Sequence, residues 1–306
     1  MSALGHSRRS RAASKSGNVL YAAGSGSQFR ALAGPRPGIA GWWHCPRRDS
    51  SPETGASNHA RRTQRLRMDR HQTDAAEQTC GVRRVNDRRV LSGIFWVLRS
   101  GAPWRDLPET YCYNRFVRWR RAGVWDRIMD ALAAGHDAAV QMIDTSVVRV
   151  HQHGACISDN NHQAMGRSRG GLTSKIHAVV DTNGLPVHLA LTPGEAHDNR
   201  LCSVLLSTLL PQTILLADRG YDADWIRELA RQQGAWANIP PKRNRKDPIC
   251  FSPYLYRARN LIERFFNKIK QRRRVATRYD KLAANYLAFV KLASIRIWLR
   301  ANESTS

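Results

Sequence analysis

Two apolar, β-branched runs joined by a glycine turn constrain the fold of this chain more than any other feature. The runs are LTSKIHAVVD and LPVHLALT, and the turn between them contains Asn183-Gly184, a pair that tolerates the positive φ of a tight hairpin. The apolar run AVQMIDTSVVRV precedes them and reads as another strand. The sequence therefore predicts three consecutive antiparallel strands.

Helices and strands alternate after this hairpin. DNRLCSVLLSTLL predicts a helix with Asp198 as its N-cap, TILLAD a short buried strand, DADWIRELARQQG a helix that ends at Gly234, AWANIP a further strand, and NYLAFVKLASIRIWLR a final helix. Three antiparallel strands followed by this alternation predict an α/β protein. Its core over residues 138–300 is expected to be ribonuclease-H-like, with a mixed five-stranded sheet flanked by helices.

A small helical domain is expected at residues 87–135, before this core. Apolar residues at helical spacing in DRRVLSGIFWVL predict one helix, and TYCYNRFVRWRRAGVWDRIMDAL predicts a second. Two helices, a turn and many arginines favour a helix-turn-helix-like module that contacts DNA through Arg118, Arg120 and Arg121. A helical bundle that packs on the next domain and has a solvated basic face is the alternative. Residues 1–80 show no sustained period and predict a disordered basic tail.

The formal net charge is +25, from 49 Lys and Arg residues against 24 Asp and Glu residues, which makes a polyanion the expected partner. Nucleic acid is favoured over an anionic membrane surface. No run approaches about 18 apolar residues and the N-terminus lacks a signal-peptide pattern, so no membrane segment is expected and the cytoplasm is the predicted location. The six cysteines lie far apart, which favours reduced thiols; a zinc site at HQHGAC is the weaker alternative.

Two aspartates occupy strand positions where burial favours apolar residues. Asp144 interrupts QMIDTSVV, and Asp218 ends TILLAD. A carboxylate in such a position is costly to desolvate unless it is paired or binds a cation. Taken singly, Asp144 could bond a neighbouring strand, and Asp218 could form a turn.

A predicted helix in YRARNLIERFFNKIK has a polar face. At about 100° per residue, Tyr256, Arg259, Glu263 and Lys270 fall within a sector of roughly 60°, while apolar residues on the other side can fill the core. A solvated Arg259–Glu263 pair, worth only about 0.3 kcal/mol, is the alternative interpretation.

Glu263 can converge with Asp144 and Asp218 at one edge of the sheet. Three such carboxylates repel one another, and two Mg²⁺ ions would relieve the repulsion while stabilising the attacking and leaving oxygens of an in-line phosphoryl displacement. In this hypothesis, Arg259 and Lys270 contact phosphates on either side of the reacting one.

The spacing of Tyr256, Arg259, Glu263 and Lys270 resembles the YREK signature of DDE transposases from bacterial insertion sequences, in the four/five superfamily. The similarity extends over about residues 87–300 and includes LRSGAPWRDLP, YNRFVRWRRAGVWDRI, IDTSVVRVHQH, GRSRGGLTSKIHAVVD, LTPGEAHD, LLADRGYD, IPPKRN and RVATRYDK. It implies a DNA transposase that catalyses metal-dependent strand cleavage and strand transfer.

The resemblance also implies a site, a cofactor and partners. Asp144, Asp218 and Glu263 would be the catalytic, metal-binding triad, with two Mg²⁺ ions for which Mn²⁺ can substitute. The implied partners are double-stranded DNA, both as terminal inverted repeats and as target, and further copies of the chain in a homodimer or larger complex on DNA. The implied location is the bacterial nucleoid.

Further DNA contacts follow from the same resemblance. Those to the terminal DNA would come from Tyr256, Arg259 and Lys270. Additional phosphate contacts would come from Arg167, Arg169 and Lys175, unless GRSRGG is only a flexible glycine loop. His197 and Asp198 in TPGEAHD read as helix-capping residues without a catalytic role.

The chain departs from the family pattern at two places. Residues 1–80 do not resemble it, and the link over residues 108–113 is shorter than the family's usual glycine- and proline-containing segment. Both departures fall in the region expected to bind DNA ends. A catalytically inactive, decayed DNA-binding remnant and a ribonuclease-H-like nuclease acting on RNA in hybrids are therefore the alternatives to an active transposase.

Overall fold

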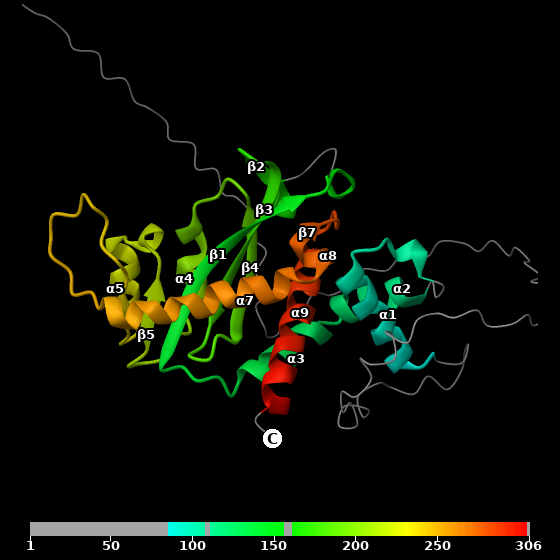
Figure 1. The fold of residues 1–306 in the computed structure, drawn as a ribbon, viewed down its shortest axis with the longest axis horizontal. Coiled ribbons are helices and arrows are strands. Elements are labelled where there is room, and N and C mark those ends of the chain that lie inside the picture. The colour runs from blue at the N-terminus through cyan, green and yellow to red at the C-terminus, as the bar shows by residue number, and fades with distance from the viewer. Residues whose placement is uncertain (1–84, 108–110, 156–160, 305–306) are drawn as a thin grey trace, which may run out of the picture. The chain divides into compact units, whose positions relative to one another are not determined.

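The structure is a computed structural model that describes residues 85–107, 111–155 and 161–304 (Figure 1). The tail expected over residues 1–80, and residues 108–110 of the link that is expected to be short, lie outside this description. All described residues after the first belong to one compact unit. Within them, every helix is too short or too polar to cross a lipid bilayer.

The sheet contains all five strands that the sequence predicts. They are β1 (Val140–Val150), β3 (Gly171–Val180), β4 (Pro186–Pro193), β5 (Ile214–Ala217) and β6 (Trp236–Asn238). Strand β3 lies between β1 and β4 and is antiparallel to both, while β5 and β6 follow on the other side of β1 and run parallel to it. The order β4-β3-β1-β5-β6 is that of a ribonuclease-H-like sheet, so the predicted fold class is confirmed.

Two short strands extend this sheet beyond the prediction. β2 (Gly166–Ser168) pairs with β3, and β7 (Thr277–Arg278) pairs with the end of β1, which gives seven strands in the described residues. Runs of two or three residues have no measurable periodicity, so hydrophobic pattern could not predict them.

Helices cover both faces of the sheet. Those that follow β4 are α4 (Cys202–Leu205), α5 (Asp224–Gln232), α6 (Pro253–Tyr256), α7 (Asn260–Lys270), α8 (Arg273–Ala276) and α9 (Ala283–Ser304). On one face, α4 and α5 pack on the strands through a core cluster that includes Ile143, Leu201, Tyr221 and Ile226. On the other face, α7 lies across β1 and α9 contacts β4 (Figure 1).

The helix expected after the hairpin is shorter than predicted and has a different cap. A 3-10 turn, Asp198–Leu201, precedes α4. Its N-cap is the His197 ring, which accepts the backbone N–H of Asn199 at 3.4 Å. The predicted capping role of Asp198 is wrong, because its carboxylate pairs with the ammonium of Lys175 at 2.8 Å.

The helix expected over YRARNLIERFFNKIK is interrupted near its start. Helix α6 begins after Ser252, whose hydroxyl accepts the backbone N–H of Leu255 at 3.4 Å. A 3-10 turn, Arg257–Arg259, follows before α7. The polar face therefore begins on a tighter turn than the regular helix that the spacing predicted.

The β3–β4 hairpin turn packs against α7. Gly184 adopts a φ of 74°, and a Cβ added there would lie 3.1 Å from the Cβ of Leu261. Asp181 closes the turn by accepting the backbone N–H groups of Asn183 and Leu185 at 2.9 and 2.8 Å. The turn therefore requires glycine both for its backbone conformation and for its close approach to α7.

Three helices precede the sheet. They are α1 (Asp87–Ser100), α2 (Tyr111–Arg121) and α3 (Val124–Ala133). The single helix expected over TYCYNRFVRWRRAGVWDRIMDAL is wrong, because Gly123 adopts a φ of 67° and separates α2 from α3. The ring of Phe289 on α9 stacks on Phe116 at 4.7 Å and on Trp104 at 5.8 Å. The helices thus share a core with α9, as the bundle interpretation expected.

Replacing Phe289 with alanine is expected to lower the free energy of unfolding by about 3 kcal/mol or more, because it leaves a cavity between α9 and the N-terminal helices. Phe289 is fully buried, whereas Tyr254 on α6 is 77% exposed. Chemical denaturation of both variants measures the difference, and Tyr254→Ala should change stability by less than about 0.5 kcal/mol. Equal losses in the two variants would contradict the shared core.

Candidate active site

Asp144 and Asp218 lie at neighbouring positions on two adjacent parallel strands. The β1–β5 register ends with Ile143 opposite Ala217, and the two aspartates are the next residue on each chain. Burial is the main cause of the raised pKa of Asp144, and the charge of Asp218 raises it further, as expected of carboxylates in proximity. The carboxyl end of β5 therefore brings together two of the three predicted acids.

Asp144 is the more enclosed member of this pair. Its side chain is 17% exposed, and one carboxylate oxygen accepts the backbone N–H of Thr145 at 2.7 Å. Burial raises its pKa, and this effect exceeds the lowering by Thr145 and by the guanidinium of Arg259. A carboxylate in this position gains stability from any added positive charge.

Asp218 also forms a turn, the alternative role that the sequence analysis gave for it. Its Oδ1 accepts the backbone N–H of Gly220 at 2.9 Å and caps the 3-10 turn Arg219–Tyr221. The same side chain is thus a turn former and a neighbour of Asp144.

Arg259 joins Asp144 to Glu263. Its Nη1 donates to Asp144 Oδ2 at 2.7 Å, and its Nη2 donates to Glu263 Oε1 at 2.5 Å. The ring of Tyr256 lies 5.8 Å from the centre of the same guanidinium. The predicted helix face therefore reaches β1, and Asp144, Asp218 and Glu263, here called the acidic edge, belong to one region.

Lys270, the last residue of α7, forms hydrogen bonds with β1. Its ammonium donates to the hydroxyl of Ser146 at 2.5 Å and to the carbonyl of Val147 at 3.1 Å. Burial lowers the pKa of Lys270. The ammonium predicted to contact phosphate is thus directed at the strand in this structure.

The remaining predicted phosphate contacts are divided between two environments. Arg167 and Arg169 are exposed at the β2–β3 hairpin, so GRSRGG is a strand and turn and not an open glycine loop. Lys175 is 14% exposed, and its ammonium donates to Asp198 and to the carbonyl of Ala196 at 2.8 and 2.7 Å. The structure does not bring Lys175 together with the two exposed arginines.

Tyr221 was missed by sequence reasoning. Its hydroxyl is buried and has no hydrogen-bond partner among the described residues. Burial raises its pKa well above the usual value, and the charges of Asp144, Asp198 and Asp218 raise it further. The signal was present in LLADRGYD, where Tyr221 follows Asp218 by three residues. Its hydroxyl is a neutral donor close to the acidic edge.

His177 is fully buried on β3, where its Nε2 pairs with the hydroxyl of Thr192 at 2.7 Å. Burial lowers the pKa of His177 to about 4, from 6.5. The unfolded chain binds the proton near pH 6.5, and the folded chain does so only near pH 4. The stability contributed by neutral His177 is therefore complete above pH 6.5. As the pH falls from 6.5 toward 4, the free energy of unfolding decreases by about 3 kcal/mol.

Urea unfolding of the wild type and of His177→Gln, from neutral pH down to about pH 4, measures this loss. The wild type should lose more stability than the variant across that interval, because the glutamine does not titrate. Parallel curves for the two proteins would assign the acid sensitivity to other groups.

A divalent cation fits the acidic edge chemically. In the described part of the chain, no three His, Cys, Asp or Glu side chains are already grouped as metal ligands. At this edge, Arg259 lies between Asp144 and Glu263. The side chains offer carboxylate oxygens, which Mg²⁺ prefers, and both the burial of Asp144 and its repulsion by Asp218 favour an added cation. At HQHGAC, the rings of His151 and His153 pack at 4.8 Å, while Cys156 lies outside the described residues.

A ribonuclease-H-like sheet with one carboxylate inside β1 and a second directly after the neighbouring strand β5 is typical of enzymes that transfer phosphoryl groups in nucleic acids. Family models place the chain more narrowly. The model described as "Transposase DDE domain" matches residues 135–298, and the model for transposases of the IS4/5 family (DUF4096) matches residues 65–129. The interpretation that residues 1–80 do not resemble the family is therefore wrong for residues 65–80. The chain belongs to the DDE transposase family, and it is a DDE-type polynucleotidyl transferase. Members of this family use divalent metal ions.

Related proteins agree with this assignment. A Brucella ovis protein predicted to be the transposase of insertion sequence element IS6501 is 42% identical over 130 residues, which are 42% of this chain and 100% of that protein. A Burkholderia cepacia protein predicted to be the transposase of IS402 is 28% identical over 137 residues, which are 41% of this chain and 62% of that protein.

Two solved structures show limited similarity. The catalytic core domain of BIV integrase has 18% identity and a TM-score of 0.31, and the match covers 55% of this chain and 98% of that one. The Mos1 transposase paired-end complex has 11% identity and a TM-score of 0.24, and the match covers 79% of this chain and 85% of that one.

Proposed function

We propose that this transposase cuts DNA at the ends of an insertion sequence and joins the resulting 3′ ends to target DNA, with Asp144, Asp218 and Glu263 as metal ligands in a catalytic domain over residues 138–300. The observation that carries the proposal is the pairing of one guanidinium with Asp144 and Glu263, beside Asp218 on the adjacent strand. Two Mg²⁺ ions, or Mn²⁺ in their place, would activate a water and neutralise charge on the reacting phosphate.

Arg259 has two successive roles in this proposal. First, its guanidinium supplies positive charge between Asp144 and Glu263. With that charge supplied by cations, the guanidinium can pair with a DNA phosphate next to Tyr256. Lys270 can do the same only after leaving Ser146, so its release accompanies DNA binding.

DNA binding involves surfaces beyond the acidic edge. Arg118 and Arg121 are exposed on α2, and the buried Nε of Arg120 has no partner among the described residues. We assign these arginines to the terminal inverted repeat, with residues 87–135 as a DNA-binding module. The exposed arginines of the β2–β3 hairpin would contact flanking phosphates. The working complex would be a homodimer or larger assembly at the nucleoid.

A cleavage assay with the full chain tests the proposal. A duplex carrying the element's terminal repeat and flanking DNA is incubated with Mg²⁺, with Mn²⁺ or with a chelator. Strand cleavage and joining to a plasmid are expected with either metal and absent with the chelator. Binding without cleavage under all conditions would favour the inactive remnant, and preferential cutting of an RNA–DNA hybrid would favour the nuclease.

A further inference from the structure

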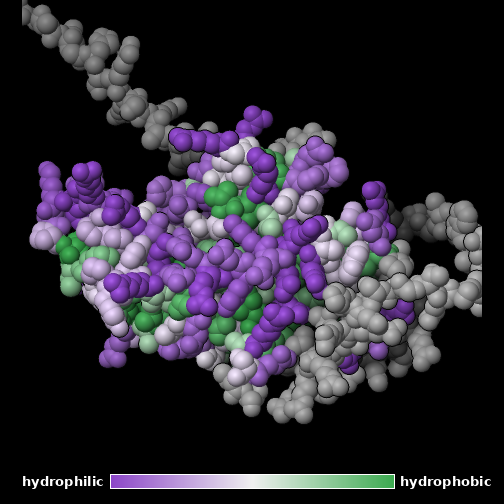
Figure 2. All heavy atoms as spheres, viewed as in Figure 1, coloured by the Kyte–Doolittle hydropathy of each residue, from purple (hydrophilic) through white to green (hydrophobic). Residues whose placement is uncertain are grey.

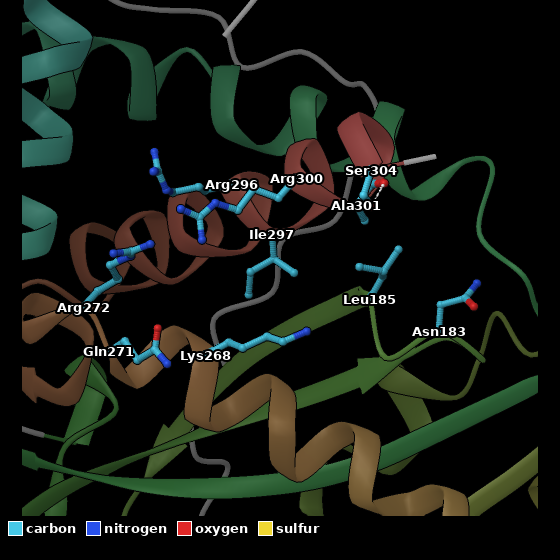
Figure 3. Close-up of a pocket in the computed structure, with 10 residues that line it drawn as sticks. All are labelled: Asn183, Leu185, Lys268, Gln271, Arg272, Arg296, Ile297, Arg300, Ala301 and Ser304. Carbon is cyan, nitrogen blue, oxygen red and sulfur yellow. Dashed lines mark hydrogen bonds between the residues drawn. The ribbon is translucent and has the colours of Figure 1, made fainter. Parts of the chain in front are cut away.

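A cavity lined by cations lies between the second half of α7 and the second half of α9 (Figure 3). Its volume is about 380 Å³. Lys268 on α7 and Arg272 just after it form one side, Arg296 and Arg300 on α9 form the other, and Leu185 of the β3–β4 hairpin contributes an apolar wall. None of these residues belongs to the acidic edge or to the DNA contacts predicted from the sequence.

The arginines of this cavity oppose one another electrostatically. Burial lowers the pKa of Arg272, and the charges of Arg296, Arg300 and Arg99 lower it further. Burial also lowers the pKa of Arg296, where Arg300 and Arg99 act in the same direction and the carboxylate of Glu303 acts against them. Like charges gathered in a partly desolvated site raise the free energy of the folded state unless an anion binds there.

One hydrogen-bond donor among these arginines has no acceptor in the described part of the chain. The Nε of Arg296 is buried and has no hydrogen-bond partner in the described part of the chain. A buried guanidinium N–H without an acceptor is costly, and a phosphate oxygen is a suitable acceptor. The cavity therefore combines excess positive charge with an unsatisfied donor.

We propose that this cavity binds backbone phosphates of double-stranded DNA beside the reacting phosphate, through Arg272, Arg296 and Arg300. The inference rests on the proposed function for the identity of the ligand. It adds a site that connects the acidic edge with the N-terminal helices, because Arg99 lies in the last turn of α1.

The position of the cavity relative to α7 determines how a bound duplex can reach it. Lys268 lies about 8 Å along α7 from Glu263 and about 140° around the helix from it, so the cavity opens on the other side of α7 from the acidic edge. Figure 2 shows hydrophilic side chains in a band over α7 on the face that Figure 1 presents. A duplex that crosses this hydrophilic band from the acidic edge can place its backbone over the cavity.

Binding of a duplex to Arg296→Gln/Arg300→Gln tests this site. The measurement is fluorescence anisotropy of a labelled terminal-repeat duplex in an Asp144→Asn background, so that no cleavage occurs during titration. Affinity is expected to fall roughly a hundredfold for two lost charge-assisted contacts. The slope of log K against log salt should shrink by about two, because each contact contributes about 0.9. Arg231→Gln, at an exposed position of α5, removes one charge outside the cavity and should leave both values near wild type.

Stability and duplex length separate a binding role from a structural one. The double variant should unfold at the same temperature as the wild type or at a higher one, because mutual repulsion is removed. Its defect should disappear on duplexes that are trimmed stepwise on the side that reaches the cavity. Arg296→Lys/Arg300→Lys keeps the charges and should keep most of the salt slope.

Three outcomes would overturn the proposal. One is unchanged affinity and salt slope in the double variant. Another is an equal defect on trimmed and full-length duplexes, which would indicate a general loss of charge. The third combines two results: inorganic phosphate raises the unfolding temperature of the wild type but not of the double variant, and both proteins bind the duplex equally well. The cavity would then be a site for small anions. These experiments measure duplex binding and not cleavage. A protein that binds the duplex through Arg296 and Arg300 but does not cleave DNA would therefore contradict the proposed function and still support the phosphate site.

Discussion

Asp144→Asn is expected to reduce the rate of DNA strand cleavage at least about 10³-fold, because losing a metal-ligand charge removes several kcal/mol of transition-state stabilisation. The substitution keeps the size of the side chain and its bond to the Thr145 backbone N–H. It removes the charge that pairs with Arg259 at 2.7 Å. The variant therefore tests charge at this position and not packing.

The measurement is cleavage of the terminal-repeat duplex at saturating protein, where binding no longer limits the rate. Asp247→Asn is the matched control, because Asp247 is an exposed carboxylate in the loop between β6 and α6. Asp218→Asn and Glu263→Gln should behave like Asp144→Asn, and all three should bind the duplex at least as well as wild type. Cleavage by Asp144→Asn within about tenfold of wild type would remove this residue from the chemistry.

The arrangement of the sheet could be predicted because it depends on local pattern. The hairpin at Gly184 and the alternation that follows it determine which strands are antiparallel and which are parallel. Once β1 and β5 are neighbours, a residue in the middle of one and a residue at the end of the other can meet, as Asp144 and Asp218 do. The spacing of the polar helix face placed Glu263 near them, even though the first turn is 3-10.

The bonds made by long cationic side chains could not be predicted in the same way. Lys175 and Lys270 were expected to face phosphates, yet their ammonium groups bond Asp198 and Ser146. A sequence gives the charge and the approximate face of such a residue, whereas its partner depends on how distant elements pack.

The cavity between α7 and α9 was missed for a related reason. Arg296 and Arg300 lie in a final helix that reads as an apolar core element, and they meet Arg272 only in the folded chain. Their spacing of four residues in SIRIWLR was the available signal, since a buried helix has few reasons to repeat arginine on one face.

Affinity for duplex DNA is expected to fall about 10³-fold or more between 50 and 200 mM salt, if roughly six to ten phosphates are contacted. The net charge of +25 and the exposed arginines Arg118, Arg121, Arg167 and Arg169 supply enough cations for that number. Each neutralised phosphate releases condensed counterions, and added salt opposes this release.

Anisotropy titrations at several salt concentrations, with the terminal repeat and with an unrelated duplex of equal length, measure this dependence. Both duplexes should give steep slopes, because phosphate contacts are independent of sequence, and the difference between their affinities should vary much less with salt. A slope near zero would mean that the positive charge is not used on the DNA backbone. The excess of cations over acids would then need another anionic partner, and the arginines of α2 and of the β2–β3 hairpin would lose their assigned role.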